Sequence, residues 1–103
     1  MEDERRQHQR VPLLLDVVWE GGAGRYEVHT TDVGMGGCFI DSLGPVTVGE
    51  ALYFKLRLPG GRWIEFRGKV ASAFPNIGFG VRFLNMSEEA RASIAQLLES
   101  AGA

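Results

Sequence analysis

The stretch from Leu52 to Leu58 is Leu-Tyr-Phe-Lys-Leu-Arg-Leu, and its alternation decides the fold class. Every even-numbered position is apolar, and two of the three odd-numbered positions are basic. A period of two places neighbouring side chains on opposite faces of a β-strand. This stretch therefore predicts a strand with one face in the core and the other in water.

Further strand candidates lie on both sides of this stretch, each bounded by glycine or proline turns. They are Val11–Trp19, Tyr26–Thr31, Cys38–Ile40, Trp63–Phe74 and Gly78–Phe83. Six short strands separated by turns are typical of a closed or sandwiched antiparallel sheet. We therefore predict an all-β domain.

The period changes after Asn85. Ser87 can cap a helix whose first turn holds two glutamates, and Ile94, Leu97 and Leu98 recur at helical spacing. One amphipathic C-terminal helix is expected.

Size and charge limit the classes of protein that fit. The chain has 103 residues, a formal net charge of −2 and one cysteine. This length suits one domain with a self-standing core, and a lone cysteine fits a reducing compartment, so we expect a cytoplasmic protein. The charged start leads into no apolar segment of signal-peptide length, and we expect no membrane span. A near-neutral charge argues against binding of long nucleic acids, but a small anionic ligand needs only a few arginines.

Residues 1–10 contain almost nothing to bury and predict a mobile basic arm ahead of a folded domain at 11–103. The arm carries three guanidinium groups, on Arg5, Arg6 and Arg10. They fit a solvated tail neutralised by the nearby acidic residues. They also fit contacts to phosphate oxygens or to the O6 and N7 edge of guanine, which the guanidinium fork matches bidentately.

A second segment, Asp32-Val-Gly-Met-Gly-Gly37, joins two predicted strands. It fits a glycine turn in which Asp32 bonds to the local backbone. It also fits a ligand contact, because glycines let a ligand approach the main chain and an ionised Asp32 accepts hydrogen bonds from N–H pairs such as those of guanine.

Catalytic residues are scarce. The histidines are His8, in the arm, and His29, on a predicted strand, and Cys38 is expected to pack as a small buried hydrophobe. No nucleophile and base, paired carboxylates or metal-ligand cluster stands out. We expect no enzymatic activity, no metal and no cofactor.

Taken together and in this order, the two segments resemble the PilZ domain family of bacterial cyclic di-GMP receptors. Arg6-Gln-His-Gln-Arg10 matches the RxxxR motif of that family, with Arg5 as an extra preceding arginine. Asp32 lies 22 residues after Arg10 and matches the first position of the D/N-x-S-x-x-G motif, and Gly37 matches its last. Later segments, among them Gly49–Pro59 and Ile77–Phe83, also resemble the family, so the resemblance covers nearly the whole chain.

The resemblance implies a six-stranded antiparallel β-barrel with a C-terminal helix. It implies that Arg6 and Arg10 clasp phosphates and guanine edges, that Asp32 reads guanine N–H donors, and that Gly37 lets a base lie against the backbone. Members of the family commonly take up a stacked pair of cyclic di-GMP molecules. Ligand would order the arm and so change the surface shown to a protein partner.

The chain departs from the motif at Gly34, where serine is expected. One lost hydroxyl hydrogen bond is worth about 0.5–1.5 kcal/mol, or up to about tenfold in affinity. Weakened binding is expected from this loss alone. A looser loop would add to the loss if preorganisation is required.

Three hypotheses remain open. The leading one is a cyclic di-GMP receptor that acts on motility or surface polysaccharide through protein contacts. The second is a degenerate PilZ domain that acts as a ligand-independent interaction module, motivated by Gly34 and by Tyr53 and Trp63 as exposed-aromatic candidates. The third is a small barrel that stacks single-stranded RNA on aromatic residues, for which no basic groove is evident. Its candidates are Phe39, Phe66 and Phe79.

Overall fold

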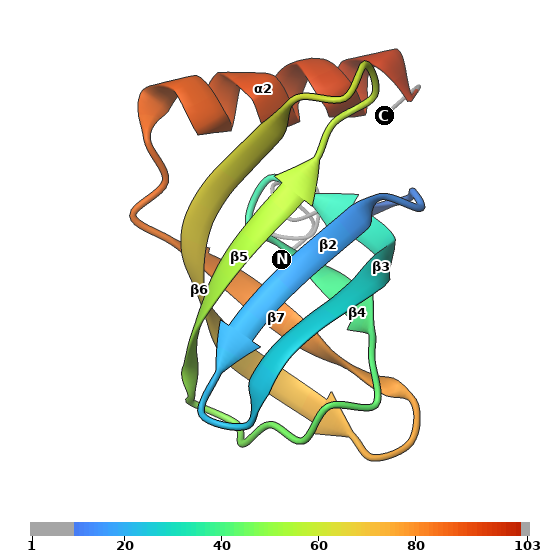
Figure 1. The fold of residues 1–103 in the computed structure, drawn as a ribbon. Coiled ribbons are helices and arrows are strands. Elements are labelled where there is room, and N and C mark those ends of the chain that lie inside the picture. Colours follow the sequence, from blue (N-terminus) through green and yellow to red (C-terminus); the bar gives the residue numbers. More distant parts are fainter. Residues whose placement is uncertain (1–9, 102–103) are drawn as a thin grey trace, which may run out of the picture.

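The computed structural model describes residues 10–101 (Figure 1). The elements in chain order are β1 (Arg10–Pro12), β2 (Asp16–Gly21), β3 (Gly24–Gly34), β4 (Gly37–Asp41), β5 (Ala51–Arg57), β6 (Trp63–Phe74), β7 (Gly78–Leu84) and α2 (Glu88–Ser100).

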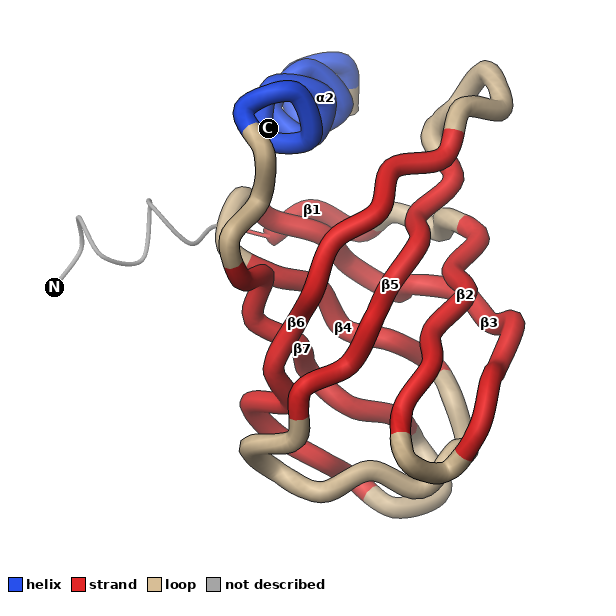
Figure 2. Tube along the Cα trace, turned by 60° about the vertical axis from the view of Figure 1, so that its left-hand side comes forward, coloured by secondary structure: helices blue, strands red, loops and turns tan. Residues whose placement is uncertain are grey.

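Six of the strands close into an antiparallel barrel. Neighbours pair in the order β3-β2-β5-β6-β7-β4, and β4 pairs back to β3 to complete the ring. β1 is an extra strand that pairs with the last residues of β3 (Figure 2). The predicted six-stranded barrel with a C-terminal helix is confirmed.

The core follows the alternation from which the fold was predicted. Leu52, Phe54 and Leu56 of β5 are buried, whereas Tyr53 and Arg57 are exposed. Other strands add large apolar side chains to the same interior, among them Trp19, Ile40, Val70 and Phe79. One continuous core therefore holds the barrel together.

The helix α2 lies across one end of the barrel (Figure 1). The Ser87 hydroxyl accepts a hydrogen bond from the Ala90 amide at 3.0 Å and caps the first turn, as predicted. Ile94, Leu97 and Leu98 are buried against the core. Across residues 10–101, no helix is both long and apolar enough to cross a membrane.

The prediction of one strand over Val11–Trp19 was wrong, because the segment forms two strands. Pro12 pairs with Asp32 and Asp16 pairs with His29, so three residues of one strand face two of the other. Such an extra residue is a β-bulge. The buried Thr30 stabilises it: its hydroxyl donates to the Leu13 carbonyl at 2.7 Å and accepts from the Leu15 amide at 2.9 Å.

The second strand is longer than predicted. The sequence placed it over Tyr26–Thr31, but β3 continues through Asp32 to Gly34. Its last residues pair with β1 on one side and with β4 on the other. Their backbone N–H and C=O groups are therefore hydrogen-bonded on both sides. Asp32 and Gly34 therefore sit on a fixed strand end.

Candidate functional site

Strand pairing brings together the two segments that the sequence analysis singled out. Pro12 lies opposite Asp32, and Arg10, two residues earlier, lies opposite Gly34. Arg10 Nη1 donates to Asp32 Oδ1 at 3.1 Å, and the two side chains keep 38% and 34% of their exposure. A pair so open to solvent contributes only about 0.2–1 kcal/mol to folding. Its main effect is to orient the guanidinium group.

Two of the three glycines of the second segment flank a tight turn. Gly34 ends β3 and Gly37 begins β4, with Met35 and Gly36 between them. A Cβ atom on Gly37 would lie 2.1 Å from the Val81 carbonyl oxygen and 3.4 Å from Arg10 Nη2. The space at Gly37 is therefore taken by the backbone of β7 and by the Arg10 guanidinium group that lies over it.

An open pocket of about 520 Å³ adjoins this position. Its lining residues are Arg10, Gly36, Gly37, Ala71, Val81, Arg82 and Phe83. The pocket thus collects residues from β1, β4, β6 and β7 around the turn. This volume is within the usual range for small-molecule sites, about 300–1,000 Å³.

The structure places four of the six candidate residues. Arg10, Asp32 and Gly37 lie together, and Gly34 is the strand partner of Arg10. Arg5 and Arg6 lie outside the described residues, as does the rest of the predicted arm. Arg10, which the sequence analysis assigned to the arm, is paired as the first residue of β1.

The cysteine behind the site is inert. Cys38 follows Gly37 on β4 and is fully buried, as predicted. Burial raises the pKa of its thiol to about 12. The positive charge of Arg10 lowers this pKa somewhat, and the negative charge of Asp32 raises it further. The thiol is therefore neutral at physiological pH and no nucleophile.

These groups suit binding rather than bond-making. Arg10 has five N–H donors, and in the described part of the chain Asp32 is its only hydrogen-bond acceptor. The remaining donors are available to a planar or anionic ligand. Asp32 can accept hydrogen bonds through oxygen lone pairs that Arg10 does not use.

Arg82 lines the same pocket and was not among the predicted site residues. It is an exposed residue on β7, within the Ile77–Phe83 segment that resembles the family but outside its two site motifs. Its place beside Gly37 depends on the pairing of β7 with β4, which local sequence does not encode. Arg82 can be recognised as a site residue only when the order of the strands in the barrel is known.

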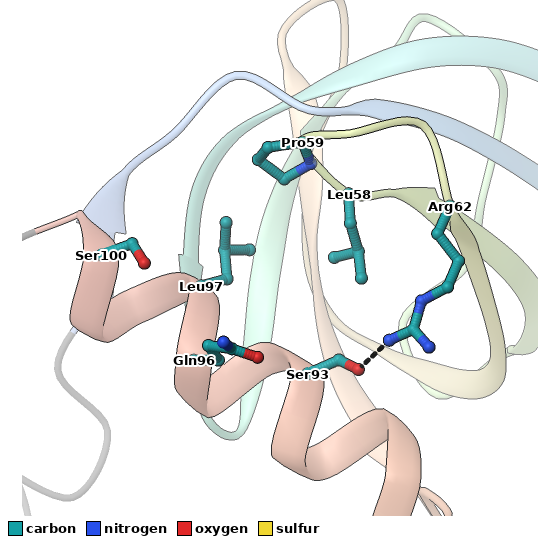
Figure 3. Close-up of a pocket in the computed structure, with 7 residues that line it drawn as sticks. All are labelled: Leu58, Pro59, Arg62, Ser93, Gln96, Leu97 and Ser100. Atoms are coloured by element: carbon teal, nitrogen blue, oxygen red, sulfur yellow. Dashed lines mark hydrogen bonds between the residues drawn. The ribbon is translucent and has the colours of Figure 1, made fainter.

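A second pocket, of about 330 Å³, lies between α2 and the loop from β5 to β6 (Figure 3). Arg62, its one charged lining residue, donates to Ser93 Oγ at 2.5 Å and lies 3.5 Å from Glu89 Oε2. The guanidinium group is thus already engaged and fastens the helix to the barrel rim. We regard this pocket as a packing gap and not as the functional site.

The aromatic residues bear on the other two hypotheses. Phe66 and Phe79 are in the core, at 6% and 1% exposure, so they offer no platform for stacking RNA bases. Tyr53 and Trp63 are exposed, as the interaction-module hypothesis supposed, at 37% and 41%.

His29 lies on β3 with its Nε2 3.3 Å from Asp16 Oδ1.

Comparison with solved structures shows the fold in other proteins. MotI/DgrA of Bacillus subtilis superposes with a TM-score of 0.81 at 20% identity, over 93% of this chain and 51% of that one. YcgR of Escherichia coli, solved in complex with c-di-GMP, gives 0.78 at 15% identity, over 95% and 46%. The PilZ domain of CeSA from a cellulose-synthesizing bacterium gives 0.68 at 16% identity, over 92% and 99%. The chain spans about half the length of MotI/DgrA and of YcgR.

Comparison with curated proteins gives no match. The family model described as the PilZ domain matches residues 4–100, which is nearly the whole chain. The fold agrees with that of the structural neighbours, with TM-scores of 0.81 for MotI/DgrA and 0.78 for YcgR. The chain therefore belongs to the PilZ domain family.

Proposed function

We propose that this chain is a cyclic di-GMP receptor domain whose ligand binds over the turn between β3 and β4. One observation carries the proposal: Arg10 and Asp32, from segments 22 residues apart, meet at 3.1 Å beside the bare backbone of Gly37. Two structural neighbours, YcgR and the PlzA protein of Borreliella burgdorferi, were solved with c-di-GMP, which supports the choice of ligand.

The chemistry of each group fits a guanine dinucleotide. The Arg10 guanidinium group can bond bidentately to a phosphate or to the O6 and N7 edge of guanine. The Asp32 carboxylate can accept from the N–H donors on the Watson–Crick edge of guanine. Gly37 carries no side chain, so a flat base could approach the backbone there once the Arg10 guanidinium group, which now lies over it, turns towards the ligand.

The arm would complete the site. Arg5 and Arg6 precede Arg10 and would add two further guanidinium groups to a ligand held at the turn. These arginines would offer three positive charges to one cyclic di-GMP, which carries two phosphodiester charges, or to a stacked pair, which carries four. Ordering of the arm around the ligand would change the surface offered to a protein partner, and that change would be the signal.

Titration calorimetry with cyclic di-GMP tests the proposal. The wild type is expected to release or absorb heat on binding, and Arg10→Ala and Asp32→Ala are each expected to lose that heat. A wild type that stays silent at high micromolar ligand would defeat the proposal.

A ligand-independent interaction module is the alternative, favoured by the exposed aromatic rings on one side of the barrel. Trp63 is 41% exposed, and the Arg57 guanidinium carbon lies 5.9 Å from the centre of its ring. Exposed Trp and Arg side chains are common at protein interfaces. A partner captured equally with and without cyclic di-GMP, and lost in Trp63→Ala, would favour this function.

A further inference from the structure

We propose that Arg82 is a further ligand-contacting residue, which binds a phosphate group of the nucleotide from the side of the pocket opposite Arg10. This inference rests on the proposed function and deepens it. It names a residue that lies outside both sequence motifs.

The strand registers place Arg10 and Arg82 at the two ends of one row. Arg10 of β1 pairs with Gly34 of β3, and Gly37 of β4 pairs with Arg82 of β7. The two glycines flank the turn that joins β3 to β4. Directly paired residues point to the same face of a sheet. Across the adjacent strands β1, β3, β4 and β7, the residues that lie side by side are therefore Arg10, Gly34, Gly37 and Arg82.

We call this row the seat: it has a cationic group at each end and two buried glycines between them. Adjacent strands lie about 4.8 Å apart, so three strand spacings separate the Cα atoms of the two arginines by roughly 14 Å. The middle positions carry no side chains, and the Arg10 guanidinium group already reaches over Gly37. A ligand in the pocket beside the glycines would thus lie between two guanidinium groups.

The pocket confirms that the two arginines face a common space. Both line the open volume of about 520 Å³, together with Phe83 and Ala71. Ala71 lies where the pairing of β6 with β7 shifts register, between Val70 and Ser72. Such a bulge re-aims the strand locally, and a small side chain there leaves room beside the turn.

The position of Arg82 is fixed by the backbone. The amide of Phe83, the next residue, donates to the Gly36 carbonyl at 2.9 Å, which ties β7 to the turn itself. On its other side, Arg82 pairs with Lys69 of β6. A contact residue whose backbone is already paired in a strand loses little backbone entropy when ligand binds.

The charges at the seat favour an anion. Within residues 10–101, Arg82 makes no ion pair, whereas Asp32 is already paired with Arg10. Arg10, Arg82 and Lys69 therefore leave an excess of positive charge around the turn. An exposed arginine is ordinary by itself. An arginine that lines a pocket with a second arginine, over a floor of glycines, fits a phosphodiester.

Titration calorimetry with cyclic di-GMP on Arg82 variants tests this role. A charge-assisted hydrogen bond is worth about 1.5–3 kcal/mol, so Arg82→Ala is expected to weaken the Kd by about 10- to 100-fold. Arg82→Lys keeps a point charge and should retain part of the affinity, whereas Arg82→Gln should not. Arg25→Ala is the matched control, because Arg25 lies on β3 next to the hairpin at the opposite end of the barrel (Figure 1). Thermal melting of each variant checks its fold.

The outcomes separate this inference from the proposed function. Arg82→Ala binding like the wild type, while Arg10→Ala fails to bind, would overturn the role of Arg82 and leave the receptor function standing. Equal loss in Arg82→Lys and Arg82→Ala would overturn the phosphate contact. A wild type that does not bind would overturn both. An unchanged Kd for Arg25→Ala and a graded loss from lysine to alanine at position 82 are the results that support it.

Discussion

Arg10 Nη1 lies 3.1 Å from Asp32 Oδ1, although 22 residues separate the two in sequence. The contact exists because β1 adds to the end of β3 and places Pro12 opposite Asp32. These two groups of the proposed binding site are thus brought together at a strand end by the fold itself.

Loss of either partner should affect binding far more than stability. The pair is one-third or more exposed, so Arg10→Ala or Asp32→Ala should lower the free energy of unfolding by less than about 1 kcal/mol. The same variants should lose cyclic di-GMP binding, because both groups belong to the proposed site. Urea unfolding and calorimetry on the same samples check the two halves of this prediction. A large loss of stability would make the pair structural and contradict it.

Restoring serine at position 34 should strengthen binding. Gly34 is not among the glycines with positive φ, so a side chain is compatible with its backbone conformation. The added hydroxyl of Gly34→Ser should tighten the Kd by up to about tenfold. Gly34→Ala is the control, since it removes the same backbone freedom without supplying a hydroxyl. If alanine tightens binding as much as serine, preorganisation and not the hydroxyl is responsible.

A side chain at Gly37 should disturb the fold as well as the site. The new Cβ would lie 2.1 Å from the Val81 carbonyl oxygen, so the paired strands must move apart. We expect Gly37→Ala to lower the free energy of unfolding by about 1–3 kcal/mol, the usual cost of overpacking. Gly22→Ala is the control, because its Cβ would meet only Glu50 Oε2 at 3.7 Å. Chemical unfolding of the two variants compares them, and equal stabilities would refute the close approach at Gly37.

The buried thiol should make stability depend on alkaline pH. Its folded pKa of about 12 lies above the ordinary value of 9.0, so the unfolded state loses the proton first. The contribution of Cys38 to stability is therefore complete below pH 9 and is lost as the pH rises from 9 towards 12. The stability difference between the wild type and Cys38→Ala should shift against the wild type between pH 8 and pH 11. A difference that stays constant across this range would mean that the thiol is not protected by burial.

The fold could be predicted from sequence because its signals are local. Alternating apolar residues marked β5, and Ser87 with the apolar positions that follow marked α2. The break in the first strand could not be predicted, because it depends on the Thr30 hydroxyl bonding to both Leu13 and Leu15. A polar residue in a strand carries no sign of such long-range partners.

Some residues of the candidate site could be predicted from the sequence, and one could not. Arg10, Asp32 and Gly37 could be proposed because they belong to motifs with a fixed spacing. Arg82 could not, since a single basic residue on the exposed side of a strand is the commonest kind of surface position. Its closeness to the turn follows from the pairing of β7 with β4, a contact between segments about 45 residues apart.

Amide chemical-shift mapping by NMR can show where cyclic di-GMP binds to the barrel. If the ligand binds over the turn from Gly34 to Gly37, the largest shifts fall on that turn and on the facing part of β7, and the Arg10 and Arg82 side-chain Nε signals move with them. No shifts are expected at Leu43 and Ile77, exposed residues in the loops at the end of the barrel away from α2 (Figure 1). Shifts confined to those loops, with the turn unaffected, would show that the ligand binds elsewhere and that the proposed site is wrong.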